Sequence, residues 1–284
     1  MKNNNSAKTQ SEKKRSLSGI LLSSPYLVWS VIFIVAPLFF VVYYAFTDRN
    51  GNFTFDNITK LGDYTGIFIH SIWIGLISTV ICLLFAYPMA YIMARSGARR
   101  QKTLMMLVML PMWMNLLIRT YSWMTLLQDT GIINNLISAI GLPRIHMIDT
   151  SFAVVVGMVY NFFPYMILPI YSVMSKIDNN LVEAAQDLGC NKLNVFRKVL
   201  FPLSLPGVVS GITMVFVPSV STFYIAGKLG GPSNLLIGDV VETQFKASNN
   251  YNLGSAISLV LMVLILICMA VMNKFADDDT NMIV

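Results

Sequence analysis

Charged residues are scarce in this chain, as are the residue types from which reactive sites are built. Lys, Arg, Asp and Glu make up 12% of the 284 residues, whereas about 25% is usual for a soluble domain. The two histidines and three cysteines lie far apart in the sequence, so we expect neither a disulfide framework nor a metal site. There is no Ser/His/Asp set, no spaced carboxylate pair and no glycine-rich phosphate loop followed by Lys. The sequence therefore predicts neither an enzyme nor a cofactor bound by this chain.

Apolar residues, in contrast, are abundant. They account for 55% of the chain, and the mean hydropathy is +0.64. One soluble core of this size cannot hide so much apolar surface, so lipid must solvate much of it. About twenty consecutive apolar residues span the hydrocarbon core of a bilayer. We predict an all-α membrane protein with six spans, near residues 24–46, 70–95, 104–127, 153–174, 206–227 and 254–274.

The distribution of Lys and Arg indicates how these spans are oriented. Fourteen of the twenty lie in the N-terminal tail, in the loops at 95–102 and 175–205, and at Lys274, whereas five lie in the loops of the opposite side. Because cytoplasmic loops carry an excess of Lys and Arg, both termini and the 175–205 loop are predicted to be cytoplasmic. The net charge of +6 is then a topology signal, with membrane lipid as its partner and no nucleic acid expected.

The N-terminus is polar and basic over residues 1–20, which are predicted to form a cytoplasmic tail ahead of a transmembrane domain at 21–284. A secretory signal peptide is the alternative interpretation. The apolar run that follows is too long for one and lacks a small-residue cleavage site.

A polar segment at 175–205 is predicted to form two short helices joined at a corner. Asp178 is a suitable N-cap for the first helix. Gly189 follows the last apolar residue of that helix, where a left-handed residue commonly ends a helix. Asn191 is predicted to begin the second helix and Pro202 to end it. The structural alternative is an ordinary amphipathic hairpin that lies on the bilayer.

Within this segment, Glu183-Ala184-Ala185, Gly189 and Pro202 resemble the EAA loop of ABC importer permeases. The usual pattern ends Ile-x-Leu-Pro, and residues 199–202 depart from it conservatively at two positions. The resemblance implies the type I importer permease fold and a cytoplasmic helix that docks into a separate ATPase, which would hold the ATP and Mg²⁺. The residues implied in this coupling are Leu181, Glu183, Ala184, Ala185, Asp187, Gly189, Phe196 and Pro202.

Prolines and polar residues inside spans two to five suggest a substrate pathway between bent helices. In lipid, each proline removes a backbone hydrogen bond that a nearby group or a water-filled cavity must replace, although simple packing kinks explain such prolines equally well. Arg119 is the one charge well inside an apolar run. Snorkelling to the outer headgroups, or pairing with Asp129, is the favoured structural explanation of its position.

The remaining pathway candidates are aromatic, polar or acidic. Aromatic faces suit an organic cation, and external carboxylates attract one, although helix packing and solvated loops are the more common roles of such residues. The full set of candidates is Trp113, Arg119, Tyr121, Tyr160, Asn161, Phe223, Tyr224, Asp239 and Glu242.

Further segments resemble the permeases of spermidine/putrescine importers, namely 119–127, 131–134, 159–169, 206–207, 229–231, 237–238 and 244–245. The resemblance implies that this chain is the first permease of a polyamine importer in the bacterial inner membrane. It also implies three kinds of partner: a second permease, an ATPase dimer and an external substrate-binding protein. Permeases for amino acids, thiamine, iron or anions share much of this pattern, so another small solute is the alternative substrate. An ATP-independent secondary transporter would more often show acidic residues or inverted repeats within its spans, and the sequence shows neither.

Overall fold

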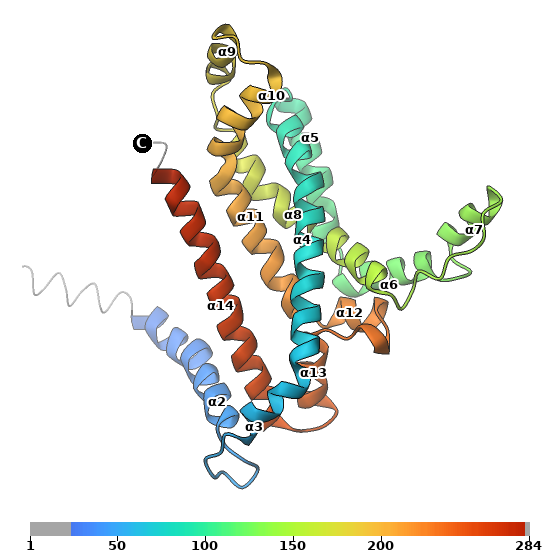
Figure 1. Ribbon diagram of the computed structural model, residues 1–284, viewed down its shortest axis with the longest axis vertical. Helices are drawn as coiled ribbons and strands as arrows, with labels where there is room; N and C mark the ends of the chain where they lie inside the picture. Colours follow the sequence, from blue (N-terminus) through green and yellow to red (C-terminus); the bar gives the residue numbers. More distant parts are fainter. Residues whose placement is uncertain (1–23, 282–284) are drawn as a thin grey trace, which may run out of the picture.

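The structure, a computed structural model, consists of helices joined by loops (Figure 1). It describes residues 24–281, with side chains through residue 272 and at Lys274. Within that range the only β pairing is an isolated bridge between Thr47 and Phe53. The predicted basic tail, residues 1–20, lies outside the described residues. The prediction of an all-α protein is confirmed.

Five of the predicted spans are long, continuous helices in the described part of the chain. The first is residues 24–45, which include η1 (Val31–Val35) and α2 (Ala36–Ala45), and the second is residues 56–94, which include α3 (Asp56–Thr59), η2 (Lys60–Tyr64) and α4 (Thr65–Ala94). The third is α8 (Ser151–Met174). The fourth is residues 192–221, which end in α11 (Phe201–Ser221), and the fifth is α14 (Tyr251–Asn281). A helix bonds its backbone groups within the segment, as lipid requires. Polar side chains in the spans do the same: Thr79 and Ser219 each donate to the carbonyl four residues earlier, at 2.7 Å.

The centre of the molecule is a packed group of three helices, α4, α8 and α11. Small residues let α11 approach α8 closely. A Cβ atom on Gly207 would lie 2.8 Å from the carbonyl oxygen of Pro169, and one on Gly211 would lie 2.8 Å from the sulfur of Met166. Because lipid gives no hydrophobic reason for helices to associate, such close backbone packing is what holds membrane helices together.

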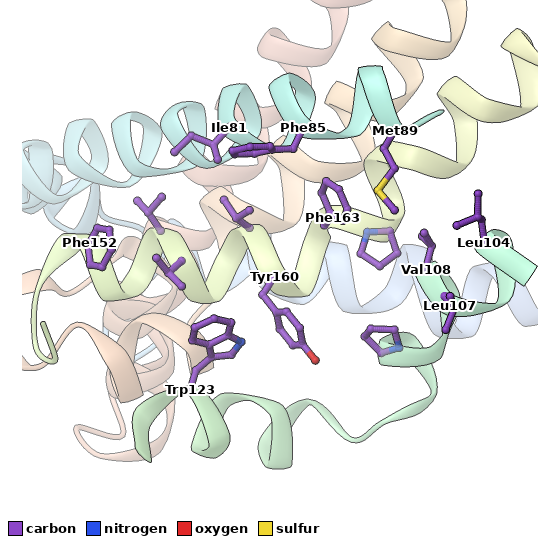
Figure 2. Close-up of a pocket in the computed structure, with 15 residues that line it drawn as sticks. Ile81, Phe85, Met89, Leu104, Leu107, Val108, Trp123, Phe152, Tyr160 and Phe163 are labelled. Atoms are coloured by element: carbon purple, nitrogen blue, oxygen red, sulfur yellow. The ribbon is translucent and has the colours of Figure 1, made fainter. Parts of the chain in front are cut away.

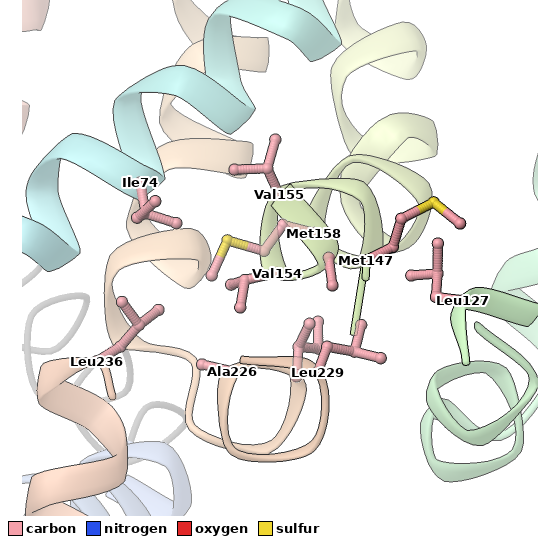
Figure 3. Packing of buried hydrophobic residues seen from close by; sticks show 11 residues of the cluster. Ile74, Leu127, Met147, Val154, Val155, Met158, Ala226, Leu229 and Leu236 are labelled. Carbon is pink, nitrogen blue, oxygen red and sulfur yellow. The ribbon is translucent and has the colours of Figure 1, made fainter. Parts of the chain in front are cut away.

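A second layer of short helices closes the outer end of this group. It contains α12 (Tyr224–Leu229), η5 (Pro232–Asn234) and α13 (Ile237–Lys246). Figure 3 shows Leu229 and Leu236 from this layer packing with Ile74 of α4 and Val154 of α8. The layer is also tied to α4 by a hydrogen bond from the Ile237 amide to the Ser71 hydroxyl, at 2.8 Å.

The first span stands apart from the central group. Its most apolar window buries none of its residues within this chain, and α2 packs against α14 (Figure 1). At its outer end, the Asn252 amide of α14 donates to the carbonyl of Thr47 at 2.7 Å. The rest of this helix requires lipid or another protein chain as its neighbour.

The predicted third span, 104–127, is not a straight helix. It consists of α5 (Ala98–Met109), η3 (Leu110–Trp113) and α6 (Leu116–Leu127), which leads on to α7 (Ile132–Ala139). Met114 and Asn115 are extended, and the helices on either side of them meet at 92°. The Asn115 side chain accepts the Leu117 amide at 2.7 Å and so caps a new helix in place of continuing the old one.

The fifth span also differs from its predicted limits of 206–227. It is helical from residue 192 and ends at Ser221, because Thr222 is extended. Gly238 of α13 passes directly against this break, and a Cβ atom there would lie 2.5 Å from the Thr222 carbonyl oxygen. Phe223 and Tyr224, predicted within the span, therefore lie in the outer layer.

Candidate functional site: an elbow and an outer aromatic seam

The polar segment between α8 and α11 forms an elbow, which we define as residues 178–200. Its first helix, α9 (Asn179–Asp187), begins at Asp178, whose carboxylate accepts the Asn180 amide at 3.0 Å. Gly189 has φ +83° and turns the chain. The second helix, α10 (Lys192–Val195), begins at Asn191, whose side chain accepts the Asn194 amide at 2.8 Å. All three of these local predictions are confirmed.

The elbow projects beyond the central helices, at the same end of the molecule as the last turns of α14 (Figure 1). None of the residues of α9 is buried. Glu183 and Ala184 are exposed, and so are the apolar side chains of Leu181, Leu188 and Leu193, with Leu188 86% exposed. An uncovered helix that carries both apolar and acidic groups has the composition of a docking surface.

The return leg of the elbow is fixed to the central helices by aromatic contacts. The ring of Phe196 meets Tyr87 of α4 at 5.5 Å, and Phe201 meets the same ring at 6.2 Å. The Tyr87 hydroxyl is also 2.9 Å from the hydroxyl of Ser204 on α11. The return leg of the elbow therefore joins α4 to the start of α11.

The prediction that Pro202 ends the second helix of the elbow is wrong. The chain stays helical from residue 192 to 221. A π-helical turn, η4 (Phe196–Leu200), leads directly into α11, and Pro202 lies in the first turn of α11. In a continuous helix a proline removes one backbone hydrogen bond. Here the wider π turn η4, in which the Phe201 amide bonds to the Phe196 carbonyl, directly precedes Pro202.

The pathway candidates converge in part where α6, α8 and α12 meet, which we call the outer seam. Trp123 of α6 packs edge-on against Tyr160 of α8, with 5.5 Å between ring centroids. The hydroxyl of Tyr224 on α12 lies near that of Tyr121 on α6. The ammonium of Lys228 lies 5.8 Å from the centroid of the Tyr121 ring. Phe223 is exposed beside this group at the start of α12.

Arg119 lies one turn before Trp123 on α6 and is buried, with 9% of its surface exposed. Its Nε and Nη1 atoms have no hydrogen-bond partner among the described residues. The proposed pair with Asp129 is wrong, because that carboxylate contacts the His146 ring at 2.9 Å. Snorkelling is also wrong, since the side chain is covered by protein. On α8, Asn161 donates to the Gly157 carbonyl at 2.8 Å, and its Oδ1 has no partner in the described part of the chain.

An apolar hollow of about 760 Å³ lies between α4, α5 and α8. Figure 2 shows Phe85 and Met89 of α4, Phe163 of α8 and Leu107 of α5 around it, with Trp123 and Tyr160 along one side. No charged side chain lines it. A lipid chain or an apolar helix face fits such a lining. Trp113, in η3, is 75% exposed and does not join the outer seam.

The two acidic candidates occupy different environments. Glu242 forms an exposed ion pair with Lys246 at 2.7 Å. Asp239, expected as a solvated loop carboxylate, is 6% exposed, and it accepts the Leu236 amide at 2.9 Å at the start of α13. Burial raises the pKa of Asp239 to about 6, partly offset by backbone amides that favour the charged form. Asp239 is thus primarily a cap that holds α13 beside α12.

The identity of the chain follows from its similarity to known proteins. Residues 86–278 match the family described as "Binding-protein-dependent transport system inner membrane component". This chain belongs to that family. As a permease of this family, it is a multi-pass protein of the bacterial inner membrane.

The permease is also similar to named relatives. It is 38% identical over 248 residues to the spermidine/putrescine transport system permease protein PotB of Haemophilus influenzae, covering 83% of this chain and 86% of that one. The PotB protein of Escherichia coli K12 is 35% identical over 245 residues, covering 83% of this chain and 89% of that one.

Among solved structures, the permease resembles a bacterial ABC transporter involved in the import of the acidic polysaccharide alginate. The TM-score is 0.77 at 19% sequence identity, and the match covers 95% of this chain and 99% of that chain. At this identity the likeness establishes the fold of the permease, which is that of an ABC importer subunit.

Two features of the permease were not predicted from the sequence. The first is Tyr87 of α4, whose ring contacts the return leg of the elbow. Its position near the cytoplasmic end of an apolar run could have suggested this contact. Lys228 was counted only as one of five outer cations, whereas the structure places it over an aromatic ring. The helix break at Thr222 explains this position, because it turns the chain so that residue 228 lies toward α6. The sequence did not indicate this break.

Proposed function

We propose that this permease carries polyamines, spermidine and putrescine among them, as one of two permeases in an ATP-driven importer. The observation that carries the proposal is the 38% identity to a spermidine/putrescine permease over 83% of the chain. The exposed aromatic rings of the outer seam agree with it, because aromatic faces attract organic cations.

The elbow supplies the coupling in this proposal. A separate ATPase dimer holds α9 by the exposed groups around Glu183, and the Gly189 corner sets the angle at which α9 meets it. Because residues 192–221 form one helix, movement of the elbow is passed along α11 toward Thr222 and the outer layer. An external binding protein delivers the substrate on that side, as the description of the family implies.

The fold does not set the substrate, since the same architecture serves a transporter of an acidic polysaccharide. An uptake measurement is therefore the test that assigns the substrate. The complete complex, reconstituted in vesicles with its companion subunits, is expected to take up radiolabelled spermidine or putrescine only when ATP is supplied. A panel of an amino acid, thiamine, ferric iron and an inorganic anion tests the alternatives.

The outcomes are distinct. Uptake of another member of the panel in place of polyamines would assign the permease to that solute. Uptake driven by an ion gradient without ATP would make it a secondary transporter and would remove the role proposed for the elbow.

A further inference from the structure

Lys228 adopts an unusual position for an exposed lysine. It lies in the last turn of α12, and its ammonium is 5.8 Å from the centroid of the Tyr121 ring on α6. The ion pairs found among residues 24–272 are His146 with Asp129 and Lys246 with Glu242, and neither includes Lys228. An aromatic face, and not a carboxylate, is thus the group that this ammonium meets.

The ring that it meets belongs to an accessible aromatic group. Tyr121 is 45% exposed and Phe223 is 42% exposed, and the hydroxyl of Tyr224 lies near that of Tyr121. The group lies beside the break at Thr222, where the fifth span ends. Aromatic faces within about 6 Å of an ammonium attract it through the negative charge of the ring face.

The backbone on both sides of Lys228 is held firmly by neighbouring elements. The Leu229 carbonyl accepts the amide of Asp149 at 2.9 Å, and the Gly230 carbonyl accepts the Asn234 side chain at 2.9 Å. On the other side, Gly227 packs against the buried Asp239 carboxylate. A Cβ atom on Gly227 would lie 2.9 Å from Oδ1 of Asp239. The lysine is therefore presented to Tyr121 from a frame fixed on three sides.

The lysine side chain has the same chemistry as the proposed substrate. It consists of four methylene groups and a primary ammonium, which is the aminobutyl unit present in both putrescine and spermidine. We propose that Tyr121 and Tyr224 form a subsite for a primary ammonium, and that Lys228 occupies it as a tethered stand-in until a polyamine displaces it. This inference rests on the proposed function. It adds Lys228 as a residue that sets the polyamine concentration needed for uptake.

The test compares Lys228→Met with wild type in the reconstituted complex, with putrescine as the probe. Removing the tethered competitor should lower the putrescine concentration for half-maximal uptake by about 2- to 5-fold, as expected for a cation–aromatic contact at an exposed site. Lys60→Met removes an equal charge from the outer side, at an exposed position in η2, and should leave that concentration unchanged.

A double substitution shows whether the effect acts through the ring. Lys228→Met should have no effect in a Tyr121→Leu background and its full effect in a Tyr121→Phe background, which keeps the ring. Added 1-butylamine should refill the subsite in Lys228→Met and raise the putrescine requirement there more than in wild type.

Several results would overturn the inference. They are an unchanged requirement in Lys228→Met, an equal effect of Lys60→Met, or an effect that persists in Tyr121→Leu. If wild type itself takes up no polyamine, the proposed function fails and this inference fails with it. Polyamine uptake that is insensitive to Lys228 removes the inference alone.

Discussion

Replacing Gly189 by Val is expected to uncouple the permease from its ATPase without harming the membrane helices. Gly189 has φ +83°, and a Cβ atom at this position would meet nothing within 4 Å. The cost of a side chain is therefore confined to the backbone. The left-handed conformation costs roughly 1–2 kcal/mol for a residue with a Cβ atom, and β-branching adds to that cost.

That cost acts on the geometry of the elbow. It lowers the population of the present corner, relative to alternatives, by about 5- to 30-fold. The apparent affinity for the ATPase should fall by up to the same factor, because binding must restore the corner. The assay is retention of the ATPase on the purified permease in mild detergent, together with substrate moved per ATP hydrolysed in vesicles.

Gly141 provides a matched control. It has φ +84° and open space around its Cβ position, and it follows α7, away from the elbow. Gly141→Val should show the same local strain and normal coupling. If Gly189→Val holds its ATPase and transports as wild type does, the docking role of the elbow is refuted. Equal losses in both variants would show that the effect is general instability.

Three further predictions concern the membrane helices and the outer layer. Gly207→Ala should lower the melting temperature of the permease in detergent, because the added Cβ atom would lie 2.8 Å from the Pro169 carbonyl oxygen. Such overpacking typically costs about 1–3 kcal/mol. An unchanged melting temperature would contradict the close approach of α8 and α11. Arg119→Met should leave the stability of the isolated chain equal or higher, because it removes a buried charge whose Nε and Nη1 have no partner, and a marked loss of stability would reveal a partner. The pKa of Asp239 is raised to about 6 from 3.8, so between about pH 4 and 6 the folded state binds more protons than the unfolded state. This group therefore makes the stability of the fold fall as pH rises through that window. Asp239→Asn, which can still accept the Leu236 amide, should flatten the dependence of melting temperature on pH.

Features determined by neighbouring residues were predictable from the sequence. The elbow is an example, because Asp178, Gly189 and Asn191 each act on the chain within three residues of themselves, as N-caps and as a left-handed corner. The apolar spans were equally accessible, since lipid imposes their length.

Features that depend on distant contacts were not predictable. Pro111 and Asn115 are consistent with a kinked but continuous span, and only the capping of Leu117 by Asn115 shows that a new helix begins. Asp129 seemed available to Arg119 until the fold placed His146 beside it. The burial of Asp239 depends on the meeting of α12 and α13, a contact that the order of residues along the chain does not reveal.

The close contact of α11 with α8 at Gly207 and Gly211 has a mechanical consequence. At about 1.5 Å per residue, roughly 22 Å of helix lies between Lys192 and Gly207, and roughly 15 Å lies between Gly211 and Ser221. The contact therefore divides one helix into an inner arm that begins in the elbow and a shorter outer arm that ends at the outer layer.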